Sequence, residues 1–275
     1  MKHITSRQNS LVSRCRDVLR GRDRNRILLD GVHLVAEAID AGVIPTEAAV
    51  AHAALATPEL AALLPQLIAA GVDVITANPL VMSAISPVKS SSPIVALAAR
   101  HTVTADELFQ PDAPVIVGAV NVQHPGNVGA IARVAEAGGA SGVAVTGQSA
   151  DPFGWKALRG SMGSAFRLPL LTEPDTGRLV QAARRHHCRV IAAVPRGGRP
   201  PDEVSLAGAV LLMVGGEGAG LPSEVVDKAD ERVTIPMTSP VESLNTAVCA
   251  ALLVYEARRQ RRAESPHGFA LSRQS

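Results

Sequence analysis

The sequence predicts an α/β protein whose mainly parallel sheet is covered by helices on both faces. From residue 115 onward, valine- and isoleucine-rich runs alternate with helical patterns, as in strands joined by crossover helices. Hydrophobic residues make up 47% of the 275-residue chain and aromatic residues only 2%, so the apolar mass is aliphatic. Aliphatic runs of this kind are typical of strands buried on both faces.

The first third of the chain predicts a smaller α/β domain, residues 1–105, that begins with a basic helical arm. Residues 27–100 contain strand-like runs such as VDVITA and PIVALAA and helical runs such as PELAALLPQLIAAG. The stretch HTVTADELFQPDAP combines proline with charge and predicts a linker. A second domain is expected over residues 112–265, followed by a flexible tail at residues 266–275.

The second domain carries the regular alternation. Helix patterns separate the strand patterns, and a polar, glycine-containing segment at 151–166 is expected to be helical in part. The expected strands are 115–121, 142–147, 189–194, 208–215 and 232–237, and the expected helices are 126–139, 177–188, 221–230 and 243–262.

Positive charge is concentrated at the two ends of the chain. Residues 1–26 hold eight lysines and arginines against two aspartates, and residues 258–275 hold five arginines against Glu264. The whole chain has a net charge of only +2, so the body between the ends is acidic. Basic ends suit a polyanionic partner such as nucleic acid, and solvated terminal helices would explain them equally well. With few aromatics, phosphate contacts and shape are expected to dominate such binding.

Several classes of protein are disfavoured. No apolar run reaches the ~18 residues of a membrane span, and the N-terminus lacks the apolar core of a signal peptide. The three cysteines are far apart, which indicates reduced thiols in a cytoplasmic protein. The segment His186–Cys188 has no second cluster with ligand spacing, so no metal site is expected.

Three loops follow predicted strands of the second domain, where open α/β sheets bind ligands. In the first, we interpret Asn127 as the N-cap of a helix whose exposed amides suit an anion. Arg133 follows within about two helical turns and is expected to face the same loop. His124, in the same loop, is a candidate proton acceptor, because a histidine can be neutral near pH 7. An ordinary capped helix with a surface arginine is the alternative.

The second loop, Gly215–Pro222, surrounds a lone carboxylate, Glu217, with glycines that allow close approach of the backbone to a ligand. Its spacing is not that of the dinucleotide fingerprint, which disfavours a nicotinamide oxidoreductase. The third loop, Ile235–Asn245, places Ser243 and Asn245 near the start of the final helix. The alternative for the second loop is a tight connection that binds no ligand, and the alternative for the third loop is simple capping of the final helix.

Taken together, the three loops resemble the motifs of the TrmH/SpoU branch of the SPOUT methyltransferases in residues, order and spacing. The matches are N-x-G-x-x-x-R at Asn127–Arg133, G-x-E-G-x-G-L at Gly215–Leu221, and I-P-M followed by S-L-N at Ile235–Met237 and Ser243–Asn245. The segment Arg159–Pro169 resembles the part that precedes the family's knot, and the whole match covers residues 112–262. More weakly, ITSRQN and Asp30–His33 are similar to an L30e-like substrate domain.

The resemblance implies a trefoil-knotted enzyme that uses S-adenosylmethionine, without a metal, to methylate structured RNA. The expected product is a 2′-O-methylated ribose in large-subunit ribosomal RNA. Transfer RNA as substrate, and a non-catalytic RNA-binding or ribosome-assembly protein, are the alternatives. The implied catalytic residues are Arg133, Asn127, Glu217, Ser243 and Asn245. The implied donor-binding residues are Val194, Gly215, Glu217, Gly218, Ile235, Met237, Ser243 and Leu244. The expected RNA-binding residues are Arg7, Arg14, Arg16, Arg20, Arg22, Arg24, Arg26 and Arg159.

The resemblance also implies a homodimer formed through the knot and the last helix, with each site drawing on both subunits. Val248, Leu252 and Tyr255 recur at helical spacing and would pack either in that interface or in the core.

The sequence departs from the family at three places: Gly216, where asparagine is commoner; Asp30, where glutamate is; and Ser239-Pro240, where glycine is frequent. Arginine holds its proton strongly, so we interpret Arg133 as a phosphate clamp rather than a base.

Overall fold

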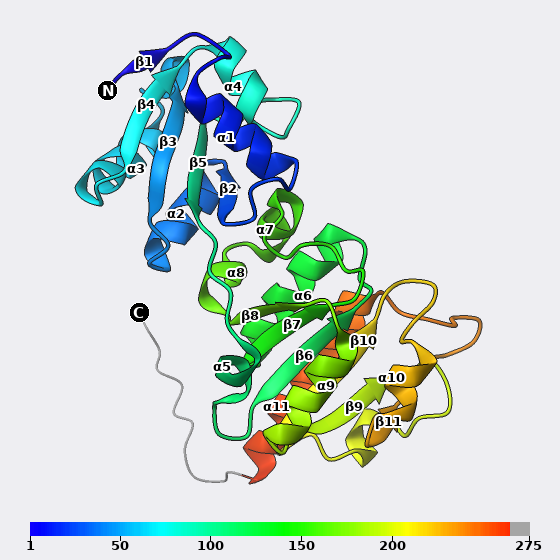
Figure 1. Cartoon of the computed structure of the whole chain (residues 1–275). Coiled ribbons are helices and arrows are strands. Elements are labelled where there is room, and N and C mark those ends of the chain that lie inside the picture. Colours follow the sequence, from blue (N-terminus) through cyan, green and yellow to red (C-terminus); the bar gives the residue numbers. More distant parts are fainter. Residues whose placement is uncertain (265–275) are drawn as a thin grey trace.

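The computed structural model describes residues 1–264 as two sheets, each with its own helices (Figure 1). The predicted tail at 266–275 lies outside the described residues. The first sheet contains β1 (His3–Ile4), β2 (Arg26–Asp30), β3 (Pro45–Ala51), β4 (Asp73–Ala77) and β5 (Ile94–Ala99), with α1 (Ser10–Leu19), α2 (Val32–Asp40), α3 (Pro58–Ala69) and α4 (Pro79–Ile85). Its strand order is β1-β4-β3-β5-β2, and β5 runs antiparallel to both its neighbours.

The segment predicted as a basic helical arm contains α1, which packs into the core of the first sheet. Leu11, Val12 and Cys15 of α1 are buried in one cluster with side chains of β2, β4 and β5. The side chain of Asn9 caps the helix by accepting the Leu11 amide. The arginines of this segment are therefore carried on a fixed surface.

A mainly parallel sheet was predicted, and the second sheet is parallel at every strand pair, with the order β11-β9-β10-β6-β7-β8. Its strands are β6 (Val115–Val120), β7 (Gly142–Thr146), β8 (Leu170–Glu173), β9 (Arg189–Ala193), β10 (Val210–Gly215) and β11 (Glu231–Val233). Its helices are α5 (Ala105–Phe109), α6 (Pro125–Gly138), α7 (Trp155–Ser161), α8 (Ser164–Arg167), α9 (Thr176–Arg185), α10 (Ser223–Asp227) and α11 (Thr246–Glu264).

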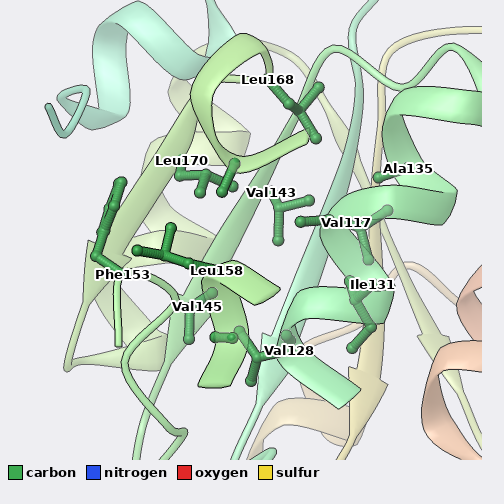
Figure 2. Close-up of a cluster of buried hydrophobic side chains, with 14 of the residues drawn as sticks. Val117, Val128, Ile131, Ala135, Val143, Val145, Phe153, Leu158, Leu168 and Leu170 are labelled. Atoms are coloured by element: carbon green, nitrogen blue, oxygen red, sulfur yellow. The ribbon is translucent and has the colours of Figure 1, made fainter. Parts of the chain in front are cut away.

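Both faces of this sheet are covered, because successive residues of each strand point to opposite sides. Val117 packs with α6, α7 and α11 on one face, where Val128 and Ile131 of α6 meet β6 and β7 (Figure 2). Ile116 packs on the other face with α5, α9 and α10. The predicted linker therefore contains a packed helix, since Leu108 and Phe109 of α5 are buried in that second cluster.

The two sheets are joined by apolar packing and by ion pairs. α7 lies against β2, and one cluster of buried side chains includes residues of both sheets (Figure 1). Arg100 pairs with Asp151 at 2.8 Å, and Arg167 pairs with Glu37 at 2.6 Å. These contacts fix the position of the first sheet relative to the second.

After β11 the chain returns to α11, which packs against α6, β6 and β10. The hydroxyl of Thr246 donates to the carbonyl oxygen of Gly215 at 2.8 Å, so the start of α11 is tied to the end of β10. The knot implied by the resemblance stays a prediction. Among residues 1–264, no helix combines the length and apolar character needed to cross a membrane.

Candidate functional site

A cavity of about 370 Å³ lies at the carboxyl ends of β9, β10 and β11. The structure brings every residue predicted to hold the methyl donor to its wall, although they come from four separate segments of the chain. These residues are Val194, Gly215, Glu217, Gly218, Ile235, Met237, Ser243 and Leu244. Their individual roles stay predictions.

The wall also contains residues that the sequence did not single out, among them Pro195, Thr246 and Cys249. Cys249 lies one helical turn after Asn245, which caps α11, so helical periodicity places Cys249 on the side of the helix nearest Asn245. Burial raises the pKa of the Cys249 thiol above its ordinary value. The periodicity of the final helix would have identified this position.

Three polar side chains from the three predicted loops meet at the edge of this cavity. Asn127 donates its amide hydrogen to Glu217 Oε1 at 2.5 Å. The amide nitrogen of Asn245 lies 3.1 Å from the same carboxylate oxygen and 3.2 Å from Asn127 Oδ1. One carboxylate thus orients two amides, and loops that are separated by up to 118 positions form one hydrogen-bonded group.

The assignment of Asn127 as an N-cap is wrong. Helix α6 begins at Pro125, and His124 occupies the cap position without a capping side-chain bond. Proline is favoured in the first helical turn because its missing N–H is not needed there. Asn127 consequently lies inside the first turn, where its side chain reaches Glu217. Capping is performed at α11 instead, where Asn245 accepts the amide of Ala247 at 2.9 Å.

Gly216 is explained by the close approach of two strand ends. A Cβ atom at this position would overlap the carbonyl oxygen of Asn121, the residue after β6. Asn121 has a positive φ of 54°, which turns the chain at the end of the strand. The glycine is therefore a steric requirement of this site, and the amide side chain commoner in the family has no room here. Ser239-Pro240, the other departure in these loops, is exposed and does not line the cavity.

A second, more polar cavity of about 780 Å³ adjoins the first. Gly216, Glu217 and Gly220 line both cavities. Its remaining wall includes Asn121, Gln123, His124, Asn127 and Gln148. The hydrogen-bonded group of Asn127, Glu217 and Asn245 thus lies between an apolar cavity and a polar one, which is a suitable position for transfer of a group between two ligands.

Arg133 does not join this site within one chain. It lies six residues after Asn127, which places it about 120° away around α6. Its side chain is exposed, lines neither cavity, and makes no hydrogen bond or ion pair with any residue from 1 to 264. The expectation that it faces the same loop is wrong for a single subunit.

The predicted RNA-binding arginines fall into two groups. Five have partners: Arg14 with Glu47, Arg22 with Asp17, Arg26 with Asp23, Arg159 with the buried Asp30, and Arg7 with the Leu80 carbonyl. Arg16, Arg20 and Arg24 have no partner within the described part of the chain. The hydroxyls of Ser86 and Ser92 donate to Asp30, each at 2.9 Å, so both carboxylate oxygens of the shorter side chain at this family position have a hydrogen-bond partner.

Comparison with known proteins places this site in a family. Residues 114–255 match the model of the SpoU rRNA Methylase family. The chain is 30% identical over 271 residues to an uncharacterized tRNA/rRNA methyltransferase of Synechocystis sp., covering 96% of each chain. It is 29% identical to the 23S rRNA (guanosine(2553)-2′-O)-methyltransferase of Bacillus subtilis, covering 94% of this chain and all of the relative. An AdoMet-bound rRNA methyltransferase from Sinorhizobium meliloti superposes with a TM-score of 0.82 at 27% identity, covering 94% of this chain and 97% of that one.

Proposed function

This chain belongs to the SpoU rRNA methylase family, and on that premise we propose that it methylates a ribose 2′-hydroxyl of large-subunit ribosomal RNA. Its methyl donor is S-adenosylmethionine, consistent with the AdoMet-bound structures that it resembles. The names of the Bacillus subtilis relative and of a Streptomyces viridochromogenes relative support the ribosomal substrate and the 2′-oxygen. The observation that carries the proposal is the hydrogen-bonded group of Asn127, Glu217 and Asn245 between the two cavities.

The first cavity fits the donor's mixed chemistry. Val194, Ile235, Met237 and Leu244 provide apolar surface for the adenosine, and the glycine-rich turn presents backbone polar groups. Glu217 places a carboxylate on the same wall, where it can attract positive charge. When bound, the donor supplies a methyl group on a positively charged sulfur.

The chain's own residues act mainly by positioning. Asn127 and Asn245, oriented by Glu217, present fixed polar groups at the boundary between the cavities, where the ribose would lie. The 2′-oxygen must form a bond to the methyl carbon while the carbon–sulfur bond breaks and the hydroxyl proton leaves. Arg133 would hold the adjacent phosphate, and catalysis would depend on proximity and electrostatics. His124, in the polar cavity, is a candidate acceptor of that proton.

We also propose that the active form is a homodimer. Val248, Leu252 and Tyr255 are 45–49% exposed on α11, which rejects their assignment to the core of one subunit and fits an interface. Arg133, remote from its own site, would then contribute to the partner's. A ribosomal substrate further implies action in the cytoplasm.

The proposal is tested by calorimetric titration with S-adenosylmethionine and, separately, with NADH, followed by methyl transfer to 23S rRNA and mapping of the 2′-O-methylated nucleotide. We expect saturable donor binding, no NADH binding and one modified ribose. Arg133→Ala should abolish transfer with donor affinity unchanged. Full activity of this variant would remove the proposed role of Arg133, and absence of donor binding with and without RNA would remove the proposed function.

A further inference from the structure

A third cavity, of about 640 Å³, lies between the two sheets and is separate from the donor site. Its walls come from the end of α1 and the following turn, β2, the segment after β5, the carboxyl ends of β7 and β8, and the loop that enters α7. This volume is within the range of about 300–1,000 Å³ that is typical of sites for small ligands.

One loop separates this interdomain cavity from the polar cavity of the candidate active site. Gln148 lines the polar cavity, and its neighbours Gly147 and Ser149 line the interdomain cavity. The loop is held to the end of β6, because Ser149 Oγ accepts the Val122 amide at 2.9 Å and Asn121 Oδ1 accepts the Gln148 amide at 2.8 Å. The three cavities therefore follow one another along the carboxyl edge of the second sheet.

The wall of the interdomain cavity carries the chain's only tryptophan. Trp155 is partly exposed there, and the ammonium of Lys156 lies 5.4 Å from its ring centroid. Deeper in the wall, the guanidinium of Arg100 lies 4.5 Å from the ring centroid of Phe153. Each of the two rings thus has one cation beside it, and only Trp155 is exposed enough for a base to stack on it, as bases do on aromatic side chains of RNA-binding proteins.

The charged groups that line this cavity suit one nucleotide. Arg24, exposed at the rim, has no hydrogen-bond or ion-pair partner among residues 1–264 and is available to a phosphate. Arg26 and Arg100 pair with Asp23 and Asp151, so the wall presents both donors and acceptors to the edge of a base. The charged residues of the lining have a net charge of only about +1, which suits a single phosphate and is less than a continuous duplex would need.

We propose that this interdomain cavity binds an unpaired nucleobase of the RNA substrate, one that is close to the methylated nucleotide in the RNA sequence. The base stacks on Trp155, and its phosphate contacts Arg24. Proteins that recognise unpaired RNA bases use aromatic and arginine side chains in this way. The inference rests on the proposed function. It adds that residues of both sheets together bind an unstacked base next to the ribose that is methylated.

Because Trp155 is the only tryptophan, its fluorescence reports directly on this cavity. A short single-stranded oligoribonucleotide of mixed sequence should quench the emission on binding, and a fully paired RNA of the same length should do so much less. Trp155→Phe, which retains a stacking ring, should retain RNA affinity by an electrophoretic or anisotropy assay. Trp155→Leu, which retains apolar packing only, should bind roughly tenfold more weakly and raise the KM for RNA.

Arg24→Glu should also weaken RNA binding and flatten its salt dependence. Arg185→Glu makes the same charge change on an exposed arginine at the opposite edge of the second sheet, and should have little effect. Donor affinity should be unchanged in all these variants. RNA binding without a change in Trp155 emission, or wild-type affinity in Trp155→Leu, would overturn the nucleobase site and leave the proposed function standing. Failure of the wild type to bind any RNA or to transfer methyl groups would overturn both.

Discussion

Cys249 gives the donor cavity a chemical reporter at the scale of a single residue. It lines the cavity, and burial raises the pKa of its thiol. Only the thiolate is alkylated, so a raised pKa leaves less reactive form at a given pH. We predict slow alkylation by iodoacetamide near pH 7, faster reaction as the pH rises beyond the ordinary thiol pKa of about 8.5, and strong protection by S-adenosylmethionine. Mass spectrometry of the peptide containing Cys249 measures each rate.

Cys188 provides the internal control for this prediction. Burial raises the pKa of its thiol to about 11, and the residue packs with α9 on the face of the sheet away from the cavity. Its alkylation should also increase with pH, but the donor should not alter it. Equal protection of both cysteines would indicate a general stiffening of the protein, and unprotected Cys249 would place the donor elsewhere.

The position of a site residue could be predicted from the sequence where the path of the backbone alone determines that position. Gly215, Gly218, Ile235 and Leu244 lie on the cavity because the ends of parallel strands meet at one edge. Asn127 was misplaced within its helix because the helix begins at Pro125, so the cap position falls on His124, three residues before Asn127. The exact helix start is a local competition between caps that sequence patterns resolve poorly.

At the scale of elements, the contact between the ends of β6 and β10 shapes both the donor cavity and the polar cavity. Gly216 permits this contact, because any Cβ atom would overlap the Asn121 carbonyl. We predict that Gly216→Ala forces the glycine-rich turn away from β6, costing about 1–3 kcal/mol of unfolding free energy. It should also weaken S-adenosylmethionine binding, because Glu217 moves with the turn. Thermal denaturation and calorimetry measure the two effects.

Gly208→Ala is the matched control for this change. Gly208 precedes β10, and an added Cβ there would meet no atom within 4 Å. This variant should keep the stability and donor affinity of the wild type. If Gly216→Ala behaved in the same way, the close approach of the two strand ends would not be needed for the cavity.

The elements that the sequence predicted best are those with long aliphatic runs. β6, β9 and β10 are buried on both faces and form the centre of the second sheet, so their patterns are continuous. β8 has only four residues, and tertiary pairing with β7 decides its conformation. α1 was predicted as a helical arm from its charges alone, and the packing of its apolar positions on the first sheet was not predicted.

At the scale of the whole molecule, alternation of strands and helices was sufficient to predict the fold class. The arrangement of the two sheets was not predictable, since it depends on contacts between distant residues such as Arg167 and Glu37. The same is true of Arg133. Its motif is clear in the sequence, but only the three-dimensional path of α6 shows that it points away from its own cavity.

The separation of Arg133 from the cavity of its own subunit leads to a specific prediction about a dimer. Arg133→Ala and Asn245→Ala should each be inactive alone, but mixing the two under conditions that exchange subunits should restore activity. In a mixed dimer one site combines the intact Asn245 of one subunit with the intact Arg133 of the other. Random exchange gives mixed dimers in half of the population, each with one of two sites intact, so about a quarter of wild-type activity is expected. Methyl transfer to 23S rRNA measures it.

The exposed face of α11 supplies the control for that experiment. Leu252→Glu places a charge on the apolar face that also contains Val248 and Tyr255. It should shift sedimentation from dimer toward monomer. When both point variants carry it, mixing them should no longer restore activity. Ile68→Glu makes the same change at an exposed apolar residue of α3, where restored activity should persist. If the two point variants form mixed dimers but stay inactive, Arg133 acts within its own chain. In that case α6 must rearrange when RNA binds, because its present path leaves Arg133 outside both cavities.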